Sequence, residues 1–190
     1  MNFLIKKIVI VIIIVIVLSG IFFGSILPLM KSRRFISSLN SIQFIKTIKE
    51  FKVNFDRPLK FYSPIGDEEI VKFLSGNIFS AIAQREQSEA TARELILYIE
   101  PYMFKNNVRH LLTLGQMYFV LWQKSGHEDD FKKAEEYYRQ ALLIGPKLPP
   151  VLYGIFDLYL AKGDKEKIKE IGGIILKYWP EDERVKNILK

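Results

Sequence analysis

The residues from Ile8 to Met30 include no charged side chain, and this run limits how the chain can fold more than any other feature. It opens with "IVIVIIIVIVLSGIFFG". A helix of this length covers roughly 34 Å, which exceeds the hydrocarbon thickness of a bilayer. We predict a membrane anchor over residues 1–30, with its span at 8–30. A cleaved signal peptide fits less well, because the run is longer than the usual apolar region and no A-x-A-like site comes after it.

The side of the membrane is left open by the flanking charges. Lys6 and Lys7 precede the span, and five basic residues lie within about 20 residues after it. The positive-inside rule therefore favours a cytoplasmic C-terminal domain, but a short basic tail is also typical of a signal anchor that exports its C-terminal domain. A single-pass protein of the cell membrane is predicted either way. The chain has no cysteine, which excludes lipid-modified cysteine, disulfides and thiolate metal ligands.

Basic residues are concentrated beside the predicted span. Residues 1–66 hold ten Lys or Arg and two acids, whereas residues 67–190 hold 18 basic and 19 acidic residues. Lys31, Arg33 and Arg34 are therefore expected to contact lipid head groups. The nearly neutral remainder lacks the basic patch of a nucleic-acid-binding domain, so no nucleic-acid partner is predicted.

A G-x-x-x-G pattern lies within the span, at Gly20 and Gly24. Small residues four apart let two membrane helices approach closely, and this pattern predicts a homodimer through the transmembrane helix. The alternative is that both glycines are ordinary, because glycine is common in membrane helices.

Helical periodicity continues through the rest of the chain, and no segment shows the alternation of a strand. Residues 31–66 are interpreted as a basic juxtamembrane helix and a divergent half-repeat, with an apolar stripe from Phe35 to Ile48. Residues 67–106 are interpreted as a divergent helix pair, whose helices begin at the candidate caps Asp67 and Ser88.

The clearest repeat signal comes from Pro146 and Pro180, which are 34 residues apart. Helices are expected at about 107–122 and 131–144, and another opens at Pro149. A turn at Gly163 and Asp164 then leads to a last helix that ends at Tyr178.

Residues 107–180 resemble the tetratricopeptide (TPR) family, whose units are helix pairs of about this period. The resemblance is carried in the first unit by Leu111, Leu114, Gly115, Tyr118, Ala134, Tyr138, Ala141 and Pro146, and in the second by Leu152, Ile155, Tyr159, Gly163 and Pro180. It implies an all-α chain, in which an N-terminal transmembrane helix precedes a TPR-like α-solenoid of antiparallel helix pairs, with two TPR units at 107–190. The segment "WQKSGHE" exceeds the usual turn and is expected to form an exposed bulge.

In this family the first helix of each pair lines a groove that holds a partner. Carried onto this chain, the resemblance implies a groove for an extended peptide or an amphipathic helix. Its residues would be Arg109, Leu112, Gln116, Phe119, Val120, Tyr153, Asp157 and Leu160. The alternative for each of them is packing against neighbouring helices.

A more specific pattern covers about residues 20–190. It is carried by Pro28, Leu29, Phe55, Leu59, Ser63, Pro64, Gly66, Glu69, Asn106, Val108 and Arg109. This order resembles the C-terminal TPR region of bacterial O-antigen ligase-like membrane proteins. The many-span catalytic portion is absent from this sequence, so the resemblance implies a polysaccharide context at the cell envelope and no ligase chemistry.

No catalytic, metal-binding or cofactor-binding motif is present. The two histidines, His110 and His127, are interpreted as a helix-surface residue and a solvated loop residue, because no third ligand lies near them in sequence. We therefore predict a non-enzymatic, membrane-anchored TPR scaffold that mediates protein–protein interaction at the bacterial cell envelope. The alternative is an accessory component of an O-antigen ligase or polysaccharide polymerase-like system.

Overall fold

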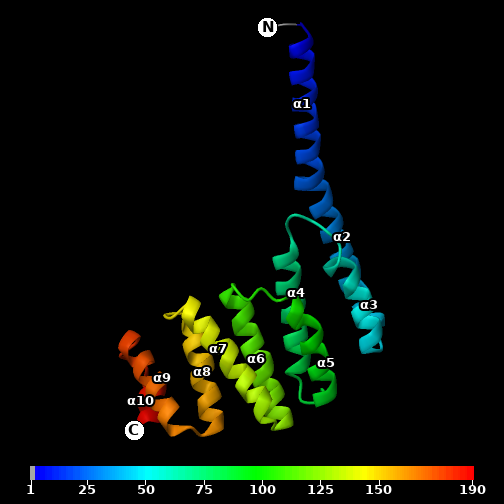
Figure 1. Ribbon diagram of the computed structural model, residues 1–190. Helices are drawn as coiled ribbons and strands as arrows, with labels where there is room; N and C mark the ends of the chain where they lie inside the picture. Colours follow the sequence, from blue (N-terminus) through cyan, green and yellow to red (C-terminus); the bar gives the residue numbers. More distant parts are fainter. Residues whose placement is uncertain (1–2) are drawn as a thin grey trace. The chain divides into compact units, whose positions relative to one another are not determined.

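The computed structural model describes residues 3–190, and over this range the chain forms helices and no strand (Figure 1). The predicted all-α class is therefore confirmed. The α-helices are α1 (Phe3–Ile21), α2 (Leu27–Asn40), α3 (Ile48–Leu59), α4 (Asp67–Ile82), α5 (Glu89–Ile99), α6 (Val108–Ser125), α7 (Glu128–Ile144), α8 (Pro149–Lys162), α9 (Lys165–Tyr178) and α10 (Glu183–Leu189).

The chain divides into two compact units. The first extends to Phe73 and the second covers Leu74–Lys190. The boundary between them falls within helix α4.

The apolar run of the first unit is helical, as predicted. A π-helical segment, η1 (Phe22–Ile26), joins α1 to α2 without interrupting the helix. The helix is long and apolar enough to cross a membrane, and its side chains from Lys7 to Ile26 are exposed. It continues past the predicted end at Met30 to Asn40, so the basic residues after the span belong to the same helix.

The apolar stripe from Phe35 to Ile48 is not one helix, contrary to the expectation. Helix α2 ends at Asn40, where the Ser41 hydroxyl donates a hydrogen bond to the carbonyl of Ser37. Helix α3 begins after Thr47, whose side chain caps it by accepting from the Glu50 N–H. The two helices then pack as a hairpin, in which Phe55 is fully buried and its ring lies 6.3 Å from that of Phe35.

In the second unit, each helix from α5 to α9 contacts the next helix in the chain, α10 packs on α9, and α6 also contacts α8. This order of contacts is that of stacked helix hairpins. The stack has two ends, at which the chain reverses direction (Figure 1).

Tyr138 on α7 holds three helices together. Its ring occupies the space that a side chain would need at Gly115 on α6 and at Gly154 on α8. A Cβ atom built on Gly115 would lie 3.1 Å from the ring, and one built on Gly154 would lie 2.5 Å from it. Because both glycines lack this atom, α6 and α8 approach the two sides of one buried aromatic ring.

The long turn expected at "WQKSGHE" is mostly helical, which corrects the prediction of an exposed bulge. Helix α6 extends to Ser125, and only Gly126 and His127 separate it from α7. Gly126 adopts the left-handed conformation (φ 70°) that ends a helix and reverses the chain at little cost to glycine. The extra residues are therefore absorbed by an additional helical turn.

The second hairpin has the predicted boundaries. Helix α8 opens with Pro149 and Pro150, and Gly163 (φ 77°) ends it. The Asp164 side chain then caps α9 by accepting from the Lys167 N–H at 3.0 Å. Helix α10 is an addition to the predicted helices; it is capped by Asp182 and buries Val185.

The contact between Tyr138 and Gly154 makes a prediction about stability. In Gly154→Ala, the added methyl group overlaps the ring, so we expect a loss of roughly 1–3 kcal/mol in the free energy of unfolding. Urea denaturation of the full chain in detergent measures it. The matched control is Gly173→Ala on α9, where nothing lies within 4 Å of an added Cβ. That variant is expected to gain up to about 1 kcal/mol from helix propensity. Equal effects in the two variants would contradict the proposed packing.

Candidate functional site

The eight residues predicted to line a groove all lie on α6 and α8, two helices that contact one another. Arg109 is exposed and the other seven are half-buried. On α6, Leu112, Gln116 and Phe119 lie at helical spacing along one face, as Tyr153, Asp157 and Leu160 do on α8. These two rows together form a surface that we name the α6/α8 face. None of its residues belongs to the buried core.

An open pocket of about 600 Å³ continues this face at the C-terminal ends of both helices. It is lined by Trp122, Gln123, Gly126, Glu128, Ala161 and Lys162. Gln123 lies four residues after Phe119, and Ala161 lies four after Asp157, so each extends its row by one turn. Sequence patterns do not reveal the pocket, because they place Trp122 and Gln123 in the expected bulge.

Trp122 is the aromatic residue in the lining of this pocket, and two further rings pack against it. The ring of Phe119 stacks on Trp122 with centroids 6.1 Å apart, and Trp122 packs edge-on against Phe131 at 5.2 Å. The Lys162 Nζ lies 5.7 Å from the Trp122 centroid and forms an ion pair with Glu128. The pocket therefore presents an apolar surface beside an ammonium group that is already neutralised.

The other part of the α8 row is held by the C-terminal segment. The Tyr153 hydroxyl donates a hydrogen bond to Asp182, and Arg184 forms an ion pair with Asp157. The bond to Asp182, and then burial, raise the pKa of Tyr153 to about 12. Tyr153 and Asp157 thus fasten α10 to α8. The part of the face without such a bridge lies on α6 and around Leu160.

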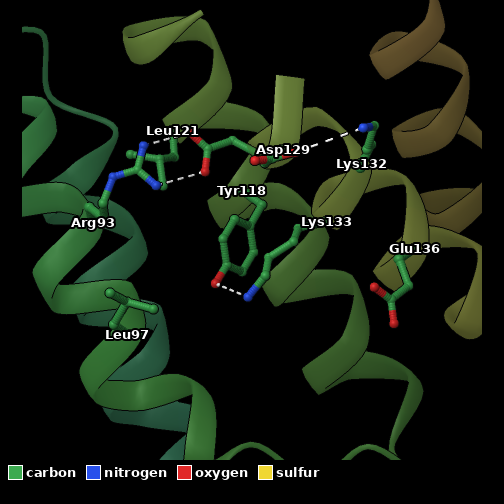
Figure 2. A pocket seen from close by; sticks show the side chains of 9 residues that line it. Arg93, Leu97, Tyr118, Leu121, Asp129, Lys132, Lys133 and Glu136 are labelled. Carbon is green, nitrogen blue, oxygen red and sulfur yellow. Dashed lines mark hydrogen bonds and ion pairs between the residues drawn. The ribbon is translucent and has the colours of Figure 1, made fainter. Parts of the chain in front are cut away.

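A second pocket, of about 430 Å³, lies among α5, α6 and α7 (Figure 2). Leu97 and Leu121 provide its apolar surface, and charged side chains surround them. Figure 2 shows Arg93 reaching from α5 toward α7, while Tyr118 and Lys133 point toward one another. The full lining is Arg93, Leu97, Tyr118, Leu121, Asp129, Asp130, Lys132, Lys133 and Glu136.

The first polar group at this pocket is an ion pair between α5 and α7. Arg93 donates two hydrogen bonds to the buried Asp130 carboxylate, at 2.9 and 2.7 Å, and Ser125 donates a third at 2.8 Å. Burial pushes the pKa of Asp130 upward, but these bonds outweigh it and leave the pKa below its usual value. The pair fastens α5 to the start of α7.

The second polar group surrounds Glu100, next to α5. Its carboxylate accepts from the hydroxyls of Tyr118 and Tyr137, and the Lys133 Nζ lies 3.6 Å away. Burial would raise the pKa of Glu100, yet the two tyrosines and the nearby lysines lower it. Burial and the bond to Glu100 raise the pKa of both tyrosines. The charges around this pocket compensate one another within the protein, which is typical of helix-to-helix braces.

Of the predicted head-group contacts, Lys31 is corrected. Its side chain is buried, donates to the carbonyl of Phe61 at 2.7 Å and pairs with Asp67. Burying an ammonium group is costly without such partners, and both partners of this lysine lie in the first unit. Arg33 and Arg34 are exposed, and the Arg34 guanidinium lies 4.0 Å from the Phe61 ring centroid.

Gly20 and Gly24 both lie on the exposed surface of the apolar helix, and nothing is within 4 Å of a Cβ built on either. Gly24 falls within η1, the π-helical turn. The surface at both glycines is accessible in the isolated chain, as a helix-association face requires.

His110 is not a surface residue, contrary to the interpretation from sequence. It is buried, and its Nδ1 accepts a hydrogen bond of 2.9 Å from the Phe104 N–H. His127 is exposed in the short α6–α7 connection, as expected. Over residues 3–190, no group of three or more His, Asp or Glu side chains is placed to hold a metal ion.

The polar braces predict how stability depends on pH. The pKa values of Glu100 and Asp130 are lowered in the folded chain, so the stability they contribute is present above their ordinary values of 4.5 and 3.8. It is lost as the pH falls below these values, because the unfolded state then binds protons more readily. The pKa values of Tyr118 and Tyr137 are raised, so stability also falls above their ordinary value of 10.0.

Urea midpoints measured across pH test this expectation. Glu100→Gln should flatten the acid limb and leave the contribution of Asp130, while Tyr118→Phe should flatten the alkaline limb. The matched control is Glu86→Gln, an exposed residue in the connection between α4 and α5. A variant of Glu100 with the parent's pH profile would show that this carboxylate is not a brace.

The chain was compared with family models, curated proteins and solved structures, and no match was found in any of them.

Proposed function

We propose that this chain is a membrane-anchored helical scaffold that binds a protein partner along the α6/α8 face. One observation carries the proposal: side chains at regular helical spacing on two neighbouring helices stand half-exposed and lead into an open pocket that Trp122 lines. A row of this kind is what a helix-stack protein offers to a ligand, because stacked helix pairs create extended binding surfaces.

The chemistry of the face favours an amphipathic helix or an extended peptide. Leu112, Phe119 and Val120 offer apolar surface, and Gln116 and Gln123 offer donors and acceptors beside it. Such a mixture matches ligands that bury one apolar side and keep polar groups at the edge. Arg109, at the start of α6, would add a positive charge for an acidic residue of the partner.

Two features support a TPR-like arrangement of the second unit. Helices α8 and α10 begin at Pro149 and Glu183, positions 34 residues apart. Tyr138 packs between Gly115 and Gly154, so one aromatic ring joins a hairpin to the next. In this proposal α10 is the closing helix of the stack, and it is fastened to α8 through Tyr153 and Asp157 at one part of the α6/α8 face.

The apolar helix α1 would hold this scaffold at the bacterial cell envelope as a single-pass anchor. Its exposed Gly20 and Gly24 support a proposal of pairing between two anchors. The second candidate function is an accessory role in an O-antigen ligase or polysaccharide polymerase-like system. In that case α1 would pack with the spans of a separate membrane protein.

Site-specific photocrosslinking tests the binding face. A photoreactive amino acid is placed at Gln116 or Gln123 in the full chain, and crosslinking is performed in native membranes. Both positions should yield the same adduct, identified by mass spectrometry, because they lie on one continuous face. The controls are Lys132 on α7 and Lys169 on α9, exposed positions away from the face. Adducts of equal yield and identity at the controls would contradict the assignment.

Replacing the anchor separates the two candidate functions. Residues 8–26 are exchanged for an unrelated apolar helix of equal length, and the crosslinks at Gln116 are measured again. A scaffold should keep its adduct, because binding depends on the second unit. An accessory subunit should lose co-purification with a many-span protein, because its own α1 made that contact.

A further inference from the structure

The two ends of the second unit differ sharply in surface chemistry. Six large apolar side chains stand exposed in this unit, and four of them, Phe104, Leu143, Ile144 and Leu148, lie at one end. This end holds the connections that lead into α6, α8 and α10. The opposite end, which holds the connections at 83–88, 126–127 and 163–164, has none of them. The two ends lie on opposite sides of the stack in Figure 1.

The four apolar residues belong to one surface, which we name the apolar end. Leu148 lies against the start of α6, since a Cβ built on Gly145 would meet both Leu148 and Val108. The Phe104 ring lies 5.4 Å from that of His110, in the first turn of α6. Leu143 is 85% exposed at the end of α7, so most of its side chain contacts solvent.

Aromatic and basic side chains surround the apolar end. The Lys147 Nζ lies 5.6 Å from the Tyr178 ring centroid, and Tyr178 packs against Trp179 at the end of α9. Lys177 is exposed at the same end, whereas Lys105 donates a hydrogen bond to the Tyr137 hydroxyl at 3.0 Å. Tyr, Trp and Lys around an apolar patch are the composition of protein surfaces that lie at the boundary between lipid head groups and acyl chains.

Acidic groups near this end are paired within the protein. Asp182 accepts from Tyr153, Glu181 and Glu183 each lie 3.0 Å from Lys186, and Glu100 is enclosed by two tyrosines. Over residues 3–190, neither Lys147 nor Lys177 forms an ion pair, so both ammonium groups are available to a partner. An anionic surface complements them.

We propose that the apolar end docks on the head-group region of an anionic bilayer, with Leu143, Ile144 and Leu148 inserted below the phosphates. The proposal rests on the proposed anchoring by α1, because the tether keeps this unit at a high effective concentration near lipid. Docking then holds the axes of the stacked helices steeply to the membrane surface. The α6/α8 face runs along these axes and remains open to a partner.

Spin labels in the full chain test this directly, since the protein has no cysteine to remove. Single variants Leu143→Cys, Lys165→Cys and Val15→Cys carry a nitroxide in vesicles of phosphatidylcholine with phosphatidylglycerol. Collision rates with oxygen and with a water-soluble nickel chelate report the depth of each label. At 143 oxygen should dominate, and at 165, on the opposite end, nickel should dominate. Leu143 and Lys165 are both exposed, so neither replacement disturbs packing.

The label at Val15 separates the two proposals. If nickel collisions dominate at Val15, this residue lies in water, and the proposal that α1 is a membrane anchor is overturned. If it lies in hydrocarbon while the label at 143 stays as accessible to nickel as the one at 165, the anchor stands and the docking proposal is overturned. A label at 143 that is shielded from both oxygen and nickel would show that protein, not lipid, covers the apolar end, and this also overturns the proposal.

Charge variants in the Leu143→Cys background test the lipid chemistry. Lys147→Gln and Lys177→Gln should each lower the ratio of docked to undocked protein by roughly fivefold, the effect of one lysine near an anionic surface. Lys165→Gln, at the opposite end, is the matched control and should leave the ratio unchanged. In vesicles of phosphatidylcholine alone, the ratio of docked to undocked protein should also fall for the Leu143→Cys parent. An unchanged ratio in both lysine variants and in neutral vesicles would overturn the role of anionic lipid.

Discussion

The packing of Tyr138 against two glycines governs the rest of the second unit. A helix hairpin made of α6 and α7 has apolar residues that it cannot bury alone, and the ring of Tyr138 projects from it toward α8. Gly115 and Gly154 let both neighbours approach this ring closely. Because interiors are packed near crystal density, an extra methyl group at Gly154 would have to move a helix. The separation of α6 and α8, and with it the α6/α8 face, depends on this contact.

Polar braces complement this apolar contact at the side of α5. The Arg93–Asp130 pair and the Glu100 cluster both connect α5, or the residues after it, to α6 and α7. The buried Asp130 and the half-buried Glu100 each accept several hydrogen bonds, which explains why charged residues are tolerated there. The pocket among these helices is bounded by groups that are already paired. The half-exposed residues of α6 and Leu160, which no such bridge covers, are on the α6/α8 face, and for this reason the proposed partner is placed there.

The two proposed interactions use different surfaces of one unit. The α6/α8 face runs along the helices, whereas the apolar end is built from connections and helix termini. A domain that rests on lipid by one end and binds a partner along its side would present that partner at a defined height above the bilayer. Lys31 adds a fixed point in the first unit, because its pair with Asp67 ties the end of the apolar helix to the chain after α3.

Local residue patterns determined the helices and many of their limits. The sequence predicted the apolar run, the caps at Ser88 and Asp164, and the end of a helix at Gly163. Each of these signals acts over a few residues, so sequence alone is enough to find it. Tertiary structure decided what depends on distant partners. It placed Lys31 against Asp67, buried His110 beside Phe104 and extended α6 through the expected bulge, so that Trp122 and Gln123 came to line a pocket. Spacing in sequence cannot show these contacts, because burial and pairing are set by whichever helix packs alongside.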